Sequence, residues 1–332
     1  MRRFLWPRVS AVVALILAFV LTFGLSAQPT PERFQVHFID VGQADAILIM
    51  NEAKNCKILI DAGDTRYPES SKNFRAYLSE HLPPGSTMDL AIATHPHSDH
   101  IGSMQWVLEN YRVKTYIDNG QEHPTNLYNN LMAVVRRQRS QNLEYYTYAS
   151  VPADKEAFCE EPGPKVRILY PQAGLDPDLC EKNQNNCSVV SKVTLRNTSF
   201  LFPGDAEREQ EEILLEDPQV KRQLNADVLK VGHHGSDTSS REELLSAVSP
   251  TWMVISAGER DVGTNKGYKH PKLATIRELL TFAGPRNNAR MIDAYDRAEK
   301  RWRQVRIWGT LFVTAKDGTV VLSTDGDNIR KE

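Results

Sequence analysis

The 332-residue sequence has only four cysteines, and no two of them form a C-x-x-C pair. Three of them, Cys159, Cys180 and Cys187, fall close together in a loop-like region rich in Pro, Asp and Asn. Cysteines of an exported chain meet an oxidising environment that favours disulfides. We expect a disulfide that staples this loop, either Cys159–Cys180 or Cys180–Cys187. The spacing leaves the choice between them open.

Beyond residue 27 the sequence lacks any apolar run that approaches the length of a membrane span. The one long run, residues 9–25, follows a basic segment that contains Arg2, Arg3 and Arg8, and the small residues Ser26 and Ala27 follow it. This order predicts an export signal cut after Ala27, with an uncleaved N-terminal membrane anchor as the alternative. We therefore divide the chain into residues 1–27 and one exported domain, residues 28–332. That domain would be periplasmic, extracellular or anchored to the outer face of the cytoplasmic membrane.

The sequence also lacks an excess of positive charge. Without residues 1–27 the chain has 37 basic and 42 acidic residues, a net charge of −5. This balance is not typical of a non-specific nucleic-acid binder. Two local basic runs remain, at residues 136–139 and 286–306. We interpret both runs as helix faces exposed to solvent. The alternative is a surface that binds a phosphate backbone.

Histidine is scarce, yet three of the nine histidines lie in one six-residue stretch, His95-Pro96-His97-Ser98-Asp99-His100. An apolar run precedes this stretch and a helix-like segment follows it, so a strand would deliver four polar side chains into a turn. Imidazole and carboxylate groups suit Zn²⁺ and Mn²⁺. Four such groups exceed what one tetrahedral ion with an open position needs. The stretch therefore predicts two adjacent metal ions.

Other polar side chains follow apolar strands in the same way. Asp205 comes after the strand at 199–202, and His233 and His234 come after the strand at 226–231. Asp61 ends the strand at 57–60, and we expect it to support a metal-bound histidine from behind. Strands alternate with helices in two successive halves of the chain. This pattern predicts an α/β protein with two sheets covered by helices.

The order of these motifs resembles that of the metallo-β-lactamase fold superfamily. Within it, the stretches Phe38–Ala46, Asn185–Val190, Phe202–Asp205, Leu229–Ser236 and Tyr268–Pro271 are similar to the hydrolase domain of ComEC-type competence proteins. Secreted phosphorylcholine esterases share much of this set. The resemblance implies a four-layer αββα fold with two mixed sheets sandwiched between helices. The sequence departs from the family in having Ala44 where Gly is usual, and it has no multi-span channel.

The resemblance also implies a ligand set for two divalent ions, Zn²⁺ or Mn²⁺. One ion would bind His95, His97 and Asp205, and the other would bind Asp99, His100 and His234, with Asp205 bridging. The histidine usual in the third motif of the superfamily is missing, and Asn185-Asn186-Cys187-Ser188 occupies that region. Cys187 as a substitute ligand is an alternative to its use in a disulfide. Either His233 or His234 could be the ligand, and the resemblance to the esterases favours His234.

From the same resemblance we expect catalysis by a metal-bridging hydroxide. Asp99 would orient that hydroxide, and His270 would stabilise negative charge or protonate a leaving group. His233, His270, Asn186 and Ser188 would contact the substrate. These roles predict an exported phosphodiesterase, which could be a nuclease, acting on DNA or on a phosphorylated cell-surface polymer without an organic cofactor. The alternatives are a hydrolase of a lactone, β-lactam or thioester, and a non-catalytic surface interaction module.

Overall fold

The structure is a computed structural model that describes residues 33–51, 53, 55–161 and 163–332. The predicted export signal or anchor, residues 1–27, lies outside these residues. Within the described part of the chain, no helix combines the length and the apolar character that crossing a membrane requires.

Six strands from the first half of the domain and two from its C-terminal end build an eight-stranded mixed sheet in the order β16-β15-β1-β2-β3-β4-β5-β6. Strands β3 to β6 run parallel to one another, and the pairs on the other side of β3 are antiparallel. The strands are β1 (Phe34–Phe38), β2 (Ile47–Asn51), β3 (Lys57–Ile60), β4 (Thr87–Ile92), β5 (Arg112–Asp118), β6 (Glu144–Thr147), β15 (Val320–Thr324) and β16 (Ile329–Lys331).

The second half builds a six-stranded mixed sheet in the order β14-β11-β10-β9-β8-β7. Its strands are β7 (Lys165–Ile168), β8 (Ser191–Leu195), β9 (Thr198–Phe202), β10 (Val228–Lys230), β11 (Trp252–Ile255) and β14 (Leu311–Val313). A separate hairpin pairs β12 (Arg290–Asp296) with β13 (Arg301–Ile307).

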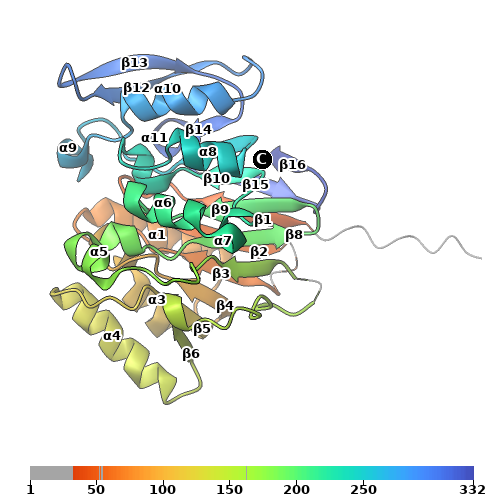
Figure 1. Ribbon diagram of the computed structural model, residues 1–332. Helices are drawn as coiled ribbons and strands as arrows, with labels where there is room; N and C mark the ends of the chain where they lie inside the picture. Colours follow the sequence, from red (N-terminus) through yellow and green to blue (C-terminus); the bar gives the residue numbers. More distant parts are fainter. Residues whose placement is uncertain (1–32, 52, 54, 162) are drawn as a thin grey trace, which may run out of the picture. The chain divides into compact units, whose positions relative to one another are not determined.

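Helices cover the outer face of each sheet (Figure 1). The helices associated with the first sheet are α1 (Pro68–His81), α2 (Ser98–Ile101), α3 (Met104–Asn110) and α4 (Asn126–Arg139). Those of the second half are α5 (Pro177–Lys182), α6 (Arg208–Glu216), α7 (Pro218–Lys221), α8 (Glu242–Val248), α9 (Asn265–Tyr268), α10 (Leu273–Phe282) and α11 (Thr314–Asp317). The chain therefore has the predicted αββα metallo-β-lactamase architecture, with two mixed sheets between helices.

Two apolar clusters show why the layers stack in this order. In β4, Leu90 and Ile92 point into the cluster between the two sheets, whereas Ala91 and Ala93 belong to the cluster under α1, α3 and α4. Alternate residues of a strand face opposite sides of its sheet. Both faces of β4 are buried, which explains why its last three residues, Leu90 to Ile92, are all apolar. The strand is thus held firmly where it delivers the histidine-rich turn.

Two expectations about secondary structure are wrong. The basic stretch 286–306 is not a helix face but most of the β12–β13 hairpin, in which the charged side chains are exposed or half-buried. The turn signal Asp317-Gly318 predicts a hairpin of residues 309–313 and 319–323, and these residues do not form one. β14 pairs with β11 in the second sheet, and β15 pairs with β1 in the first. The short helix α11 carries the chain from one sheet to the other, a connection that no local turn signal specifies.

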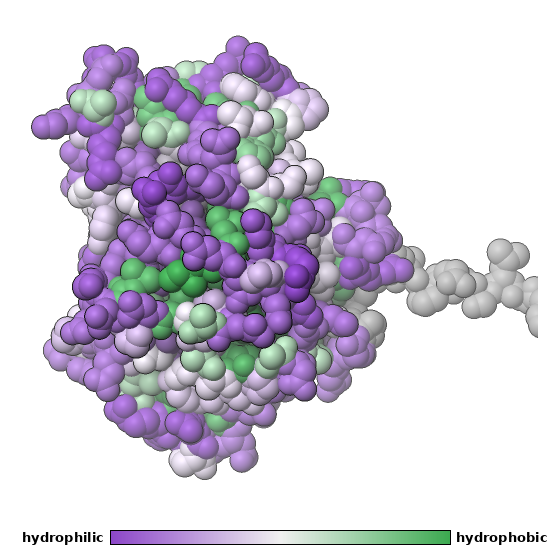
Figure 2. Space-filling view, viewed as in Figure 1, coloured by the Kyte–Doolittle hydropathy of each residue, from purple (hydrophilic) through white to green (hydrophobic). Residues whose placement is uncertain are grey.

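Two disulfides lie in the domain, Cys56–Cys159 and Cys180–Cys187. The second confirms one of the two expected pairings and excludes Cys159–Cys180. It also overturns Cys187 as a substitute metal ligand, because a disulfide sulfur has no thiolate to offer. Two disulfides are consistent with an extracytoplasmic domain. Most of the face seen in Figure 2 is hydrophilic, and its apolar residues lie in small groups.

Candidate metal centre

The predicted site residues lie in turns at the ends of strands of the two sheets. The turn after β4 carries His95 to His100, the turn after β9 carries Asp205, and the turn after β10 carries His234. Gly204, with φ of +60°, brings the Asp205 turn against the first sheet. A Cβ atom there would lie 2.9 Å from Cβ of Thr94. The packing therefore requires glycine at this position.

Four side chains form the centre of the site. The Nε2 atom of His100 lies 3.2 Å from Oδ2 of Asp205, and Nε2 of His234 lies 3.4 Å from the same oxygen. Oδ2 of Asp99 lies 3.7 Å from Nε2 of His234. All four of these side chains are buried. The structure thus brings together the four residues expected to hold one ion.

The other ring nitrogens of these histidines are occupied. Nδ1 of His100 lies 2.8 Å from Oδ2 of Asp61, and Nδ1 of His234 lies 2.9 Å from the carbonyl oxygen of Ser256. A carbonyl or carboxylate oxygen only accepts, so Nδ1 carries the hydrogen in each ring. When the ring is neutral its lone pair therefore sits on Nε2, the atom that faces Asp205. This is the tautomer that a metal-binding histidine needs.

The charges of these groups are strongly coupled. Burial acts to lower the pKa of His100, but Asp205 and Asp61 outweigh it and raise that pKa well above its usual value. Burial likewise opposes a raised pKa at His234, where Asp205 and Asp45 prevail. Burial would raise the pKa of Asp205, yet His100 and His234 hold it well below its usual range. Without a metal, protons on the histidines balance the carboxylates.

His95 and His97 form a second pair of ring nitrogens. Nε2 of His95 lies 3.0 Å from Nδ1 of His97. The hydroxyl of Thr94 donates to Asp61 and so can accept a hydrogen bond from Nδ1 of His95, 3.2 Å away. Nε2 of His95 is then left with its lone pair toward His97. Burial lowers the pKa of both rings, that of His95 well below its usual value, so both are neutral near pH 7.

Unsatisfied atoms test whether the site suits a cation. Among the described residues, Nε2 of His234 and Oδ1 of Asp205 are buried without a hydrogen-bond partner. Leaving such atoms unpaired is costly, so each unsatisfied group calls for an explanation such as a bound ion. One ligand atom from each of Asp45, His100, Asp205 and His234 lies within 4.8 Å of the others. This buried cluster could hold a metal ion.

Asp45 belongs to that cluster by distance but lies on its far side. Its carboxylate is 3.8 Å from Nδ1 of His100 and 3.7 Å from Nδ1 of His234. These are the nitrogens that already carry hydrogens. The geometry therefore places Asp45 behind the histidines, where it can orient them, and leaves coordination to Asp205.

Two cationic side chains also lie at the site, although the sequence did not predict them there. Each lies near one oxygen of a predicted carboxylate ligand. The buried ammonium of Lys230 contacts Asp45 and lies 3.7 Å from Oδ1 of Asp205. The half-exposed Arg66 lies 3.4 Å from Oδ1 of Asp99. In both carboxylates the other oxygen, Oδ2, faces the histidine Nε2 atoms. A lysine between two apolar residues of a buried strand was the only sequence signal for Lys230.

His233 and His234 occupy a turn with an unusual backbone. Both have positive φ, 46° and 53°, a conformation that side chains other than glycine rarely adopt. Nδ1 of His233 lies 3.1 Å from Glu207, and its Nε2 lies 3.7 Å from Oδ2 of Asp205. Both rings thus point toward Asp205, His234 from the buried side and His233 from the open side.

His270 lies next to this turn, and its ring centroid is 5.4 Å from that of His233. The amide of Gln43 accepts from the Gly258 N–H, so its NH₂ group points at Nδ1 of His270, 3.2 Å away. Nδ1 therefore accepts, and Nε2 carries the hydrogen. Burial and the neighbouring His233 lower the pKa of His270 well below its usual value. The ring is a neutral hydrogen-bond donor.

Asn186 and Ser188 lie deeper than the predicted substrate contact requires. The amide of Asn186 bonds to Glu209 and to the Gln210 N–H of α6. The hydroxyl of Ser188 accepts from the Asp205 N–H and lies 3.4 Å from Nδ1 of His95. Both side chains are buried. Their contacts support the Asp205 turn from behind.

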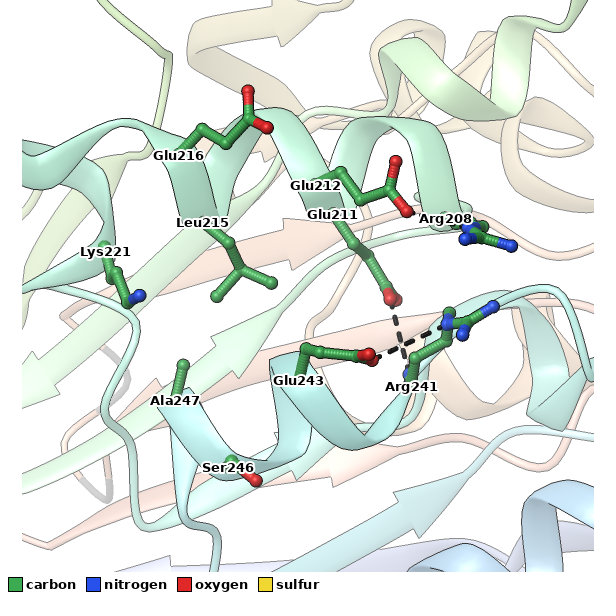
Figure 3. Close-up of a pocket in the computed structure, with 10 residues that line it drawn as sticks. All are labelled: Arg208, Glu211, Glu212, Leu215, Glu216, Lys221, Arg241, Glu243, Ser246 and Ala247. Carbon is green, nitrogen blue, oxygen red and sulfur yellow. Dashed lines mark hydrogen bonds and ion pairs between the residues drawn. The ribbon is translucent and has the colours of Figure 1, made fainter.

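A separate pocket of about 520 Å³ lies between α6 and α8 (Figure 3). Its charged side chains pair with one another, as Arg208 does with Glu212 and Arg241 with Glu243. Glu211 points between the helices and accepts from the N–H groups of Ser240 and Arg241. Burial raises its pKa to about 7. None of the predicted site residues lines this pocket.

Comparison with known proteins agrees with this geometry. A family model described as the metallo-β-lactamase superfamily matches residues 39–157. ComE operon protein 3 of Bacillus subtilis is 31% identical over 258 residues, which cover 74% of this chain and 30% of that protein. Recombination protein 2 of Haemophilus influenzae is 28% identical over 253 residues, 76% of this chain and 27% of that protein. The chain thus spans less than a third of the length of either relative.

Among solved structures, the subclass B3 metallo-β-lactamase MEM-A1 from a soil metagenome library overlaps with 64% of this chain and 90% of its own. The identity is 13% and the TM-score 0.37, a likeness that does not bear on the substrate. Competence protein ComA of Neisseria gonorrhoeae is 37% identical to this chain over 89 residues, 27% of this chain and 12% of that protein. The order of the motifs and these relatives agree on one assignment. The chain belongs to the metallo-β-lactamase superfamily and is similar to competence proteins of the ComEC type.

Proposed function

We propose that the protein is a metal-dependent hydrolase of phosphodiesters. The observation that carries this proposal is the convergence of two histidine Nε2 atoms on one buried oxygen of Asp205. His100, His234, Asp99 and Asp205 would hold one divalent ion, Zn²⁺ or Mn²⁺. His95, His97 and Asp205 would hold a second. Two such ions activate a water molecule and stabilise charge on a substrate oxygen.

The surrounding residues would prepare the ligands. Asp61 orients His100 directly and His95 through the Thr94 hydroxyl. Lys230 and Arg66 each attract one oxygen of a carboxylate, which leaves the other oxygen for the metal. Held in this way, each carboxylate would bind through one oxygen only. The lysine also limits the negative charge that Asp45 and Asp205 together bring into the site.

The open side of the cluster would bind the substrate. The neutral His270 can donate from Nε2 to an oxygen of a phosphoryl group or to the leaving oxygen. His233 is half-buried beside Asp205 and lies on the same side. Arg66 donates to the hydroxyl of the exposed Tyr268, 2.8 Å away. Asp99 lies between Arg66 and His234, where it can orient the attacking water. The donors His270 and Arg66 suit an anionic phosphodiester better than a neutral carbonyl substrate.

The relatives support a role connected with DNA, because two of them are named as competence or recombination proteins. DNA is therefore the first substrate to test, and a phosphorylated cell-surface polymer is the second. The two disulfides support action outside the cytoplasm. We propose that the domain is exported, as a periplasmic, extracellular or membrane-anchored protein.

The test uses the purified full chain loaded with Zn²⁺ or Mn²⁺. We would measure bound metal and the turnover of bis-p-nitrophenyl phosphate, single-stranded DNA, a phosphorylcholine ester and nitrocefin. We expect turnover of the phosphodiesters, which Asp205→Ala abolishes. The matched control is Asp178→Asn, because Asp178 is an exposed residue of α5 and is not one of the predicted site residues.

Absence of turnover on all four substrates by the metal-loaded protein would refute the enzyme assignment. Hydrolysis of nitrocefin alone would refute the choice of phosphodiesters and favour a carbonyl substrate.

A further inference from the structure

Two pockets border the metal cluster on different sides. One has a volume of about 430 Å³ and contains His270 in its wall. The other has a volume of about 520 Å³ and contains His123, whose ring centroid is 5.6 Å from that of His97. Both volumes lie in the range of small-ligand pockets. Each pocket therefore adjoins a residue at the edge of the site.

The β12–β13 hairpin forms one side of the first pocket. Met291 and Asp293 of β12 face it together with Trp302 and Gln304 of β13. Trp302 is half-buried, and its indole donates to Asp261 at 3.0 Å. This bond holds the ring in place. The basic stretch 286–306 thus supplies an aromatic wall next to His270.

Helix α4 forms one side of the second pocket. Tyr128, Met132 and Arg136 of this helix line it, and Tyr145 of β6 lies across from them. Arg136 belongs to the other basic run of the sequence. In Figure 1, α4 and the β12–β13 hairpin lie at opposite ends of the domain, with the strand ends that carry the cluster between them. The two basic runs therefore reach the site from its two sides.

Neither pocket has an excess of charge of one sign, but both have aromatic side chains in their walls. In the first, Arg260 and Lys316 are matched by Glu259 and Asp293. In the second, Arg136 is matched by Glu122. A pocket with balanced charges gains little from phosphates alone. Tyrosine, tryptophan and arginine planes instead stack on nucleobases, and each stacked base contributes noticeably to binding.

We propose that each pocket receives one nucleoside, so that the phosphodiester joining them lies over the metal cluster. This inference rests on the proposed function and deepens it. Tyr128 and Arg136 would contact the nucleoside on the His97 side, and Trp302 would contact the one on the His270 side. The substrate is then a single strand, because paired bases could not enter two separate pockets. Binding would depend only weakly on salt, since few phosphates are neutralised.

The experiment compares substrates that fill the pockets with one that does not. We would measure kcat and KM of the full chain on oligothymidylate, on thymidine 5′-monophosphate p-nitrophenyl ester and on poly(glycerol phosphate), a phosphodiester without aromatic rings. We expect Tyr128→Ala, Arg136→Gln and Trp302→Ala each to lower kcat/KM on oligothymidylate about tenfold. Turnover of poly(glycerol phosphate) should stay within about twofold of wild type. Its retention also shows that the variants fold.

Two neighbours serve as controls. Arg137 stands beside Arg136 but pairs with Glu109, and Arg301 stands beside Trp302 but pairs with Glu299. Arg137→Gln and Arg301→Gln should leave oligothymidylate turnover unchanged. Equal losses in the control and pocket variants would overturn the proposal, as would equal losses on all substrates. If the pocket variants lower the turnover of poly(glycerol phosphate) and leave that of oligothymidylate unchanged, the nucleoside assignment is refuted.

A binding measurement separates this inference from the proposed function. Fluorescence anisotropy with labelled oligothymidylate and Zn²⁺-loaded protein needs no turnover. Binding that is weakened by Trp302→Ala but followed by no cleavage would refute the phosphodiesterase assignment and leave the two pockets supported. Absence of binding together with turnover of bis-p-nitrophenyl phosphate would refute the pockets alone.

Discussion

The two sides of the metal cluster are prepared in different ways. On one side, His100 donates directly to the buried carboxylate of Asp61, and negative groups raise its pKa. On the other side, His95 reaches the same carboxylate only through the hydroxyl of Thr94, and burial lowers its pKa. The first side is held by charge and the second by a neutral hydrogen-bond relay. The difference suggests that the two sides respond differently to mutation and to pH.

The largest effect should come from Asp205, because both sides depend on it. Asp205→Ala removes the carboxylate that His100, His233 and His234 all face. We expect loss of bound metal from both sides and a fall in kcat of about a thousandfold or more. Metal analysis and phosphodiester turnover measure this. Retention of one tightly bound ion would show that the two sides do not share Asp205.

Removal of one histidine from each side should separate the two ions. His234→Ala should lose the ion held with His100, and His95→Ala should lose the ion held with His97. Each variant is expected to bind one equivalent where the wild type binds two. Metal content after dialysis checks this, and thermal melting of the metal-free proteins controls for folding. Loss of both ions in both variants would mean that the sides bind metal only together.

Asp61→Asn should weaken both sides at once, because it removes the carboxylate behind His100 and the acceptor of the Thr94 hydroxyl. Loss of such a supporting group typically costs 10- to 100-fold in metal affinity. Competition with a chelator gives the dissociation constants. The exposed Asp178→Asn variant, which should keep wild-type affinity, is the control.

The pH dependence of metal binding should differ between the sides. The raised pKa values of His100 and His234 mean that protons occupy these rings near neutral pH, so binding must displace them. Affinity on this side should fall as pH falls, by about tenfold per unit for each proton released. The lowered pKa values of His95 and His97 leave no proton to displace near pH 7.

Chelator competition at pH 6, 7 and 8 tests this. The His95→Ala variant reports the first side, and the His234→Ala variant reports the second. Equal slopes in the two variants would contradict the comparison.

The smallest effect should fall on the relay. Thr94→Val keeps the backbone bond from Thr94 to Asp61 but removes the hydroxyl that accepts from His95. We expect affinity to drop several-fold on the His95 side, at the low end of the range for supporting groups. It should change less on the His100 side, where Nδ1 also lies 3.2 Å from the Thr94 hydroxyl but bonds directly to Asp61. Ser188→Ala, which removes a longer contact of 3.4 Å to His95, should have less effect still. A larger loss of metal affinity on the His100 side would show that the Thr94 hydroxyl supports His100 more than His95.

Much of the site could be predicted because its residues obey a local rule. His95, His97, Asp99 and His100 lie in one turn, and Asp61, Asp205 and His234 each follow an apolar strand. Strand ends of a sheet meet at one edge, so these residues had to converge. The basic stretch 286–306 does not form a helix face, because its two halves pair as antiparallel strands, and charge alone does not specify that pairing. The substrate contacts of Asn186 and Ser188 stay predictions from the family resemblance, and the sequence did not indicate that both side chains are buried.

Other features depend on approach between distant segments. Lys230 meets Asp45 across the two sheets, and Arg66 meets Tyr268 across 202 residues. Cys56 pairs with Cys159 in the same long-range way. By itself the sequence determined the fold class and the main ligand candidates, since hydrophobic period and strand-end position are local. Only the tertiary structure decided which cation faces which carboxylate and which ring nitrogen keeps its lone pair, because those depend on distances that packing alone sets.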